Sequence, residues 1–236
     1  MAEDSSGNLY VGLHYSQTPP LILKSIDDGA SWSSTSPAPP WGTGDINCVA
    51  VNPANDWIYV ANDGGAGKAG IWRSKDGGST WTYIVSVVAN AIPRWRLAIY
   101  PYDEQIIFLG SEKAANRIGY ITDDGTAGPF VPTTVKTLGD YAVMWGRYFN
   151  EELWFGTAHV GGAPAGNSQV VRSIDGGTTW EEVDAKLNPA QRRSFYFTTA
   201  HPERQNKIFP TKTTYNRRII VGDEGDSVGL GEKCRP

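Results

Sequence analysis

The sequence has few of the residues that mark disulfide-rich, metal-binding or haem proteins. Its 236 residues include two cysteines, Cys48 and Cys234, and three histidines. Two cysteines do not make a disulfide framework, so Cys48, which lies in an apolar run, is expected to be a small core residue. The histidines fall in different parts of the chain without the spacing of metal ligands. We therefore expect no metal site and no cofactor.

Charge is also sparse, and no apolar run is long enough to cross a bilayer. Charged residues make up 19% of the chain and the formal net charge is −4. Binding to a phosphate backbone requires a basic surface that this composition lacks. The first residues lack the basic and apolar regions of a secretory signal. We expect no nucleic-acid partner and no membrane insertion, and we slightly favour an extracellular or virion-surface location.

Turn-forming and aromatic residues are abundant instead. The chain contains 27 glycines, 9 tryptophans and 11 tyrosines. Many turns together with many aromatic residues favour strands over helices. The length is sufficient for one large domain with its own core, and we expect a single all-β domain over residues 1–236.

A short motif of the form S-x-D-x-G-x-[ST]-W recurs along the chain, and we call each copy a box. The near-complete boxes are residues 25–32, 74–81 and 173–180, and degenerate copies begin at residues 121 and 221. The period is about 50 residues, which is typical of propeller blades. The residues that define the three good boxes are Ser25, Asp27, Gly29, Trp32, Ser74, Asp76, Gly78, Trp81, Ser173, Asp175, Gly177 and Trp180.

A strand, a polar turn and a second strand precede each box. Residues 49–53 with 57–60 and residues 97–101 with 106–109 show this pattern most clearly. Each unit therefore reads as a four-stranded antiparallel blade in which the box is the turn between the third and fourth strands. The box Asp would accept hydrogen bonds from turn N–H groups, and the box Trp would be buried between sheets. We assign blades to residues 1–38, 39–88, 89–137, 138–187 and 188–236.

The first unit has too little sequence before its second strand, residues 9–13, to supply a full inner strand. A propeller normally closes by pairing strands from both termini within one blade. We therefore expect the first blade to be incomplete, and the chain to be a fragment of a larger propeller or assembly. Closure of five blades without a full clasp and a strand supplied by a neighbouring chain are the alternatives.

The boxes resemble the Asp-box, or BNR, repeats of sialidases, xyloglucanase-type glycosidases, sortilin-type receptors and photosystem assembly factors. This resemblance covers nearly the whole chain and implies a β-propeller. It also implies that the boxes lie on the rim away from the ligand face, so that Asp27, Asp76 and Asp175 are structural. The Arg-Ile-Pro signature that precedes the first box of sialidases is absent, and Ile92-Pro93-Arg94 does not replace it.

The loops that lead into the inner strands are the candidate ligand site, because such loops converge at one mouth of a propeller channel. Guanidinium groups bind carboxylates and aromatic rings stack on sugars, whereas the alternative is ordinary solvated loop charge with aromatic anchors. The candidate ligand-binding residues are Arg94, Arg96, Arg192, Trp95 and Tyr141, with Trp41 and Arg193 in the same loops. The weak catalytic candidates are Asp45, Asp63 and Asp140.

Two classes of function remain open. The favoured one is a non-catalytic binding or structural module with a glycan or protein partner, because no complete catalytic constellation is visible. The alternative is a glycoside hydrolase, which needs two carboxyl groups at a set separation. The run Asp63-Gly64-Gly65 follows a second strand, where xyloglucanase-type enzymes place a similar Asp-Gly-Gly, although those enzymes are longer and have two propellers.

Overall fold

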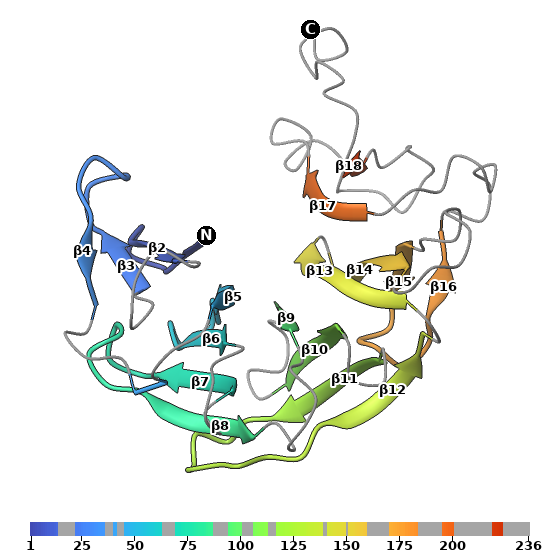
Figure 1. Cartoon of the computed structure of the whole chain (residues 1–236), viewed down its shortest axis with the longest axis horizontal. Coiled ribbons are helices and arrows are strands. Elements are labelled where there is room, and N and C mark those ends of the chain that lie inside the picture. Colours follow the sequence, from blue (N-terminus) through green and yellow to red (C-terminus); the bar gives the residue numbers. More distant parts are fainter. Residues whose placement is uncertain are drawn as a thin grey trace, which may run out of the picture.

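The computed structural model describes a set of strands arranged around an open arc (Figure 1). The residues described are 1–13, 22–35, 40–41, 45–62, 69–86, 94–100, 106–112, 117–138, 141–149, 151–159, 170–183, 195–200 and 219–223. Within these ranges there is no helix, and so none that could cross a membrane.

Four sheets follow one another along the chain, and each has its four strands in sequence order. The first contains β1 (Ala2–Glu3), β2 (Leu9–Gly12), β3 (Ile22–Ser25) and β4 (Ser33–Ser34). The second contains β5 (Ile46–Val51), β6 (Ile58–Asn62), β7 (Gly70–Ser74) and β8 (Thr82–Ser86). The third contains β9 (Arg94–Ile99), β10 (Ile106–Glu112), β11 (Arg117–Thr122) and β12 (Thr133–Thr137). The fourth contains β13 (Tyr141–Phe149), β14 (Glu152–His159), β15 (Val170–Ser173) and β16 (Glu181–Glu182).

Every described pairing is antiparallel, so the predicted β-propeller of four-stranded blades is confirmed. Among the described residues, the number of complete four-stranded blades is four rather than the five expected. In the fifth unit the described residues form a two-stranded sheet of β17 (Phe195–Ala200) and β18 (Ile219–Asp223). The inner strands β5, β9 and β13 face the centre of the arc, and β8, β12 and β16 lie at its periphery (Figure 1).

The expectation that the first blade lacks an inner strand is wrong. Ala2 and Glu3 pair with Tyr10 and Leu9 and make the fourth strand of that sheet. The short strand is held by the turn that follows it, in which the Asp4 carboxylate accepts hydrogen bonds from the backbone N–H groups of Ser6 and Asn8. Two residues are enough for an inner strand here because this local turn fixes its register.

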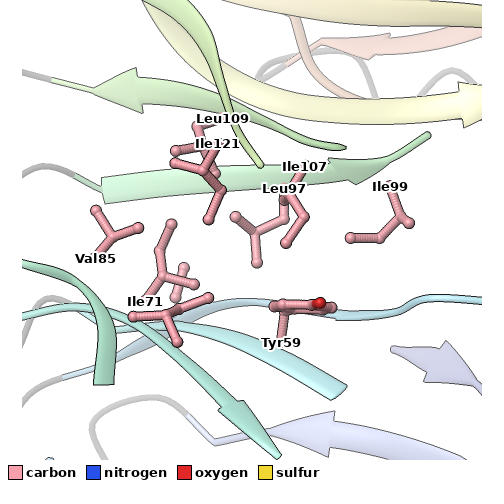
Figure 2. Packing of buried hydrophobic residues seen from close by; sticks show 10 residues of the cluster. Tyr59, Ile71, Val85, Leu97, Ile99, Ile107, Leu109 and Ile121 are labelled. Carbon is pink, nitrogen blue, oxygen red and sulfur yellow. The ribbon is translucent and has the colours of Figure 1, made fainter. Parts of the chain in front are cut away.

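The hydrophobic core lies between adjacent blades rather than inside a single sheet. Alternate side chains of a strand point to opposite neighbours, so Ile107 and Leu109 pack toward the second blade while Phe108 packs toward the fourth. Tyr59 and Ile71 belong to the same cluster as Ile107, between the second and third blades (Figure 2). The second strands of the middle blades, β6 and β10, are therefore buried on both faces, which explains their nearly continuous apolar sequence.

The three good boxes form the same hydrogen-bonded turn between the third and fourth strands. In the fourth blade the buried Ser173 hydroxyl donates to Asp175 Oδ1 at 2.8 Å and accepts from Gly177 N at 2.8 Å. Thr179 donates its hydroxyl and backbone N–H to the same carboxylate. Asp27 and Asp76 are held in the same way. The predicted role of the box Asp as an acceptor in the turn is thus what the structure shows.

These hydrogen bonds favour the charged form of each box carboxylate. Bonds from Ser31, led by its hydroxyl, lower the pKa of Asp27 to about 2, and those from Thr179 lower the pKa of Asp175 to about 2. For Asp76, slight burial acts to raise the pKa, but the bonds from Thr80 and Ser74 outweigh it and the pKa is lowered.

The boxes of the second and fourth blades are also seated on the blade before them. A Cβ added to Gly78 would lie 2.5 Å from Thr35 Cβ of the first blade, and one added to Gly177 would lie 2.3 Å from the Phe108 ring of the third. Both glycines have positive φ, 93° and 90°. Glycine is therefore required at this position for two reasons: the backbone conformation and the close approach of the neighbouring blade.

The expected deep burial of the box tryptophans is wrong for Trp32, which is 38% exposed. Trp180 makes the same local bond as Trp32, from indole Nε1 to the carbonyl of the box glycine, at 2.9 Å and 3.0 Å respectively. Trp180 is only partly exposed because it also packs on Phe108 of the preceding blade. No described residue of a preceding blade covers Trp32, so its burial differs although its turn is the same.

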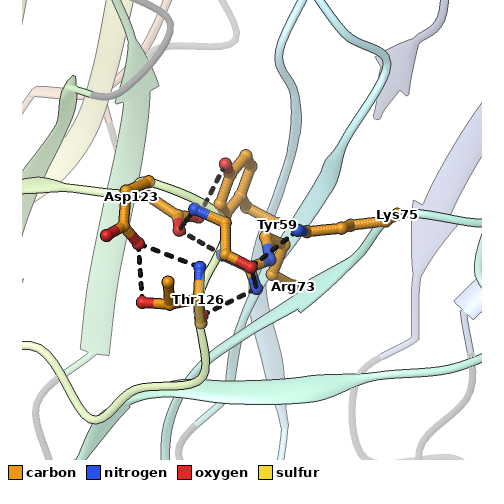
Figure 3. A network of polar contacts seen from close by, with 7 residues as sticks. Tyr59, Arg73, Lys75, Asp123 and Thr126 are labelled. Carbon is orange, nitrogen blue, oxygen red and sulfur yellow. Dashed lines mark hydrogen bonds and ion pairs between the residues drawn. The ribbon is translucent and has the colours of Figure 1, made fainter.

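The degenerate third box is attached to the second blade by a polar network instead of a tryptophan (Figure 3). Asp123 accepts hydrogen bonds from Arg73 and from the Tyr59 hydroxyl, and all three groups are buried. Arg73 Nη2 also donates to the carbonyls of Gly125 and Thr126, both at 2.9 Å. We call Tyr59, Arg73 and Asp123 the interblade clamp.

We predict that Asp123→Ala lowers the free energy of unfolding by about 3–5 kcal/mol, because it leaves the Arg73 charge buried without its partner. The double variant Arg73→Met/Asp123→Leu should lose markedly less, since no charge remains buried. Equilibrium denaturation in urea gives both values. Equal losses in the single and double variants would contradict this account of the clamp.

We predict unequal costs for truncating two box tryptophans. Trp180→Ala should cost about 3 kcal/mol because it opens a cavity between two blades. Trp32→Ala should cost no more than about 1 kcal/mol, because its ring already faces solvent on one side. Thermal and chemical denaturation of the two variants, side by side, provide the measurement.

We predict that the box carboxylates make stability depend on acid pH. Their folded pKa values lie below the unfolded value, so the stabilisation is complete above about pH 4 and is lost as the pH falls from about 4 to 2. Melting temperatures across this range should therefore fall, and the carboxyl carbon shift of Asp175 should titrate near pH 2. Titration of Asp175 at its ordinary value near 4 would contradict the prediction.

Candidate functional site

One end of the sheets gathers polar residues, at the point where inner strands begin and second strands end. The register pairs here are Ile46 with Asn62, Arg94 with Glu112 and Tyr141 with His159. The box turns are at the opposite end, because Ser74 at the end of β7 pairs with Ile58 at the start of β6. We call the end at which the inner strands begin and the second strands end the mouth end.

In the second blade the mouth end carries an acid and an amide that are both buried. Asp45 comes directly before β5 and is 7% exposed, and Asn62, the last residue of β6, is 1% exposed. The catalytic candidate Asp45 is thus placed at the expected end of the sheet, within a packed setting.

In the third blade, Arg94 is the first residue of β9 and Trp95 follows it, opposite Ser111 of β10. Arg96, expected to face a ligand, donates from Nη1 to the carbonyl of Asn47 on the neighbouring inner strand at 3.2 Å. This bond joins β9 to β5, so Arg96 has a role between blades close to the mouth end.

In the fourth blade, Tyr141 begins β13, and the register shifts between Val143 and Trp145. A similar shift lies between Ile46 and Cys48 in β5. Such irregularities reverse the alternation of side chains along a strand, and here both occur just inside the mouth end.

Trp41, which the sequence suggested as a sugar-stacking residue, is fully buried. Its ring meets Trp72 with centroids 5.9 Å apart and Trp81 with centroids 5.1 Å apart, both edge to face. The alternative interpretation, an aromatic anchor beneath the loop, is the one the structure shows. Trp41 is therefore part of the core between the first and second blades.

The described residues thus bring Asp45, Arg94, Trp95 and Tyr141 to the beginnings of successive inner strands. Asp63, Asp140, Arg192 and Arg193 lie outside the described residues, so their place in the site stays a prediction. The residues that end the second strands, Asn62, Glu112 and His159, were not among the candidate site residues taken from the sequence. Counting the antiparallel register outward from each turn would have found them.

The strand ends at the mouth end carry acidic, basic, histidine and aromatic residues in neighbouring blades. Such a set can bind hydroxyl or carboxylate groups of a ligand, and its carboxylates and imidazole can transfer protons. In the described part of the chain, no three His, Cys, Asp or Glu side chains come together as metal ligands do.

Several known proteins are similar to this chain. The chain is 27% identical to a xyloglucanase of Hypocrea jecorina (strain QM6a), over 72% of this chain and 24% of that enzyme. No family model matches. The crystal structure of a GH74 xyloglucanase from Xanthomonas campestris superposes with a TM-score of 0.62 and 14% identity, over 86% of this chain and 33% of that one. A Hadza microbial sialidase superposes with a TM-score of 0.51 and 18% identity, over 74% and 42%.

The structural neighbours of this chain include sialidase and xyloglucanase β-propellers. At these levels of identity the likeness of the structures shows the fold alone. The chain spans about a quarter of the length of the curated relative and a third of the xyloglucanase structure.

Proposed function

We propose that the chain is a carbohydrate-active propeller of the glycoside hydrolase type, which binds a xyloglucan-like β-glucan at its mouth end. The observation that carries this proposal is the 27% identity to a xyloglucanase over 72% of the chain. It favours the hydrolase-type interpretation over a purely structural module, because the similarity to a carbohydrate-degrading enzyme extends over most of the blades.

The chemistry of the mouth end supports the proposal. Sugar rings bind through stacking on aromatic faces and through hydrogen bonds to their hydroxyl groups. Trp95 and Tyr141 are aromatic residues at the starts of β9 and β13, and Arg94, Glu112 and His159 are polar residues on the same ladders. A polysaccharide laid across the third and fourth blades would pass all five residues.

Hydrolysis would require a second step beyond binding. Both stereochemical routes of glycoside hydrolysis use two carboxyl groups, about 5–5.5 Å apart in retaining enzymes and about 6.5–9.5 Å apart in inverting ones. Asp45 is the described candidate for one of them, and Asp63 and Asp140 are the sequence-based candidates for the other.

We predict that the protein binds xyloglucan in affinity gel electrophoresis, and that Arg94→Ala and Tyr141→Ala each weaken binding at least tenfold, a loss of about 1.4 kcal/mol. Polygalacturonate and polysialic acid serve as acidic comparison glycans. Asp28→Asn is the matched control, because Asp28 is exposed in a box turn at the opposite end.

The same preparations should be assayed for release of reducing ends, with Asp45→Asn as the variant. Release that disappears in Asp45→Asn assigns hydrolysis to this end of the propeller, whereas binding without release assigns a binding role. Absence of binding to every glycan, or binding that survives both mouth-end variants, would exclude the proposal.

A further inference from the structure

In the second and fourth boxes the box Asp is followed directly by a glycine. The two pairs are Asp76-Gly77 and Asp175-Gly176, and we call them the box Asp-Gly bonds. Both glycines have a positive φ of 68°, so the turn favours glycine at this position. Asp-Gly is also the pair at which aspartate isomerises most readily, because glycine has no side chain to hinder attack by its backbone nitrogen. The turn therefore places a chemically labile bond at the rim of each of these blades.

Isomerisation begins when the backbone nitrogen of the glycine attacks the carboxyl carbon of the preceding aspartate. The N–Cγ bond forms, a Cγ–O bond breaks, and the amide proton leaves with the hydroxyl group as water, which gives a five-membered succinimide ring. Water then opens the ring at the main-chain carbonyl carbon, whose bond to nitrogen breaks. The product is isoaspartate, in which the main chain runs through the former side-chain carboxyl and the former main-chain carbonyl becomes a free carboxylate.

The carboxylates of both box Asp-Gly bonds are held away from this reaction by three hydrogen bonds each. Asp175 Oδ1 accepts from the Ser173 hydroxyl and from Thr179 N, both at 2.8 Å, and Oδ2 accepts from the Thr179 hydroxyl at 2.6 Å. Asp76 accepts the equivalent bonds from Ser74 and Thr80, at 2.8, 2.8 and 2.6 Å. A near-planar succinimide ring requires a side-chain torsion between the staggered rotamers. Ring closure therefore has to break these bonds first.

The same bonds keep the carboxyl group in its less reactive form. Hydroxide or water leaves from a neutral carboxyl group, whereas a carboxylate is a poor electrophile. Bonds from Thr179, led by its hydroxyl, lower the pKa of Asp175 to about 2. The neutral form is therefore scarce at neutral pH, in addition to the geometric restraint.

We propose that the box aspartates Asp76 and Asp175 are latent isoaspartate sites, which the hydroxyl groups of Thr80 and Thr179 keep from reacting. The threonine hydroxyl then has a chemical role beyond the stability of the turn. Isoaspartate adds a methylene group to the main chain and removes the carboxylate that accepts the turn hydrogen bonds. Once formed, it would disrupt the box turn irreversibly.

The test compares Thr179→Val and Thr80→Val with the wild-type protein during prolonged incubation at neutral pH. Valine keeps the branched shape and the backbone N–H of threonine and removes only the hydroxyl. Peptide mapping with electron-transfer fragmentation distinguishes isoaspartate from aspartate at each site. We expect Thr179→Val to accelerate isomerisation about tenfold at Asp175 and not at Asp76, and Thr80→Val to do the reverse, because a hydrogen bond to a charged group contributes a factor of this order.

Thr178→Val is the matched control within the same box. The Thr178 hydroxyl donates to the main-chain carbonyl of Asp175 at 3.1 Å and not to its carboxylate, so this variant should leave the rate at Asp175 unchanged. Wild-type protein unfolded in urea gives the rate without any restraint, which we expect to exceed the folded rate at both sites. Melting curves establish that the variants are folded under the conditions of incubation.

A rate at Asp175 that Thr178→Val raises as much as Thr179→Val overturns the proposal, because general loosening of the turn would then be the cause. Acceleration at both box Asp-Gly bonds in a single variant also overturns it, since the effect would come from unfolding of the whole chain. The proposal fails as well if neither hydroxyl removal changes the rate, or if unfolding in urea does not.

Discussion

The packing of one sheet face against the next is the interaction on which this structure depends. In the described part of the chain the apolar clusters are shared between blades: Tyr59, Ile107 and Leu109 pack in one layer, and Phe108, which lies between Ile107 and Leu109 in sequence, packs in the next. A four-stranded sheet with two apolar faces is stable only between two neighbours. The stability of each blade is therefore tied to the presence of the blades beside it.

Two different chemistries maintain this packing at the rim. In the fourth blade, the indole ring of Trp180 packs on Phe108. The third blade has Ile121 in place of the box Ser, and there Asp123 accepts hydrogen bonds from Arg73 and Tyr59. The adjacent Asp124 then accepts the turn hydrogen bonds from Thr126. Loss of the motif in the third repeat is thus accompanied by a buried ion pair at the same interface, and the arc continues without a gap.

Features encoded within a few residues were predictable from the sequence, and features that depend on distant neighbours were not. The box turns and the four-stranded order follow from local hydrogen bonding and alternation, and both are confirmed. The exposure of Trp32 could not be read from its box, because a neighbouring blade decides it. The clamp joins Arg73 to Asp123, 50 residues apart, and no pattern in the sequence pairs them. At the mouth end, the register shifts in β5 and β13 hide the direction of side chains from simple alternation.

The serine of the box has a consequence for how the strands find their alignment. A strand that is buried on both faces lacks the difference between a core face and a solvent face that normally disfavours a register shift by one residue. Ser74 and Ser173 end their strands with a hydroxyl that is committed at once to the box carboxylate and to the box glycine N–H. A shift by one residue would break both bonds and push an unsatisfied hydroxyl into the sheet. The box turn therefore fixes the register of the strands. Through the register it also determines which residues stand at the opposite end of the blade, where the ligand would bind.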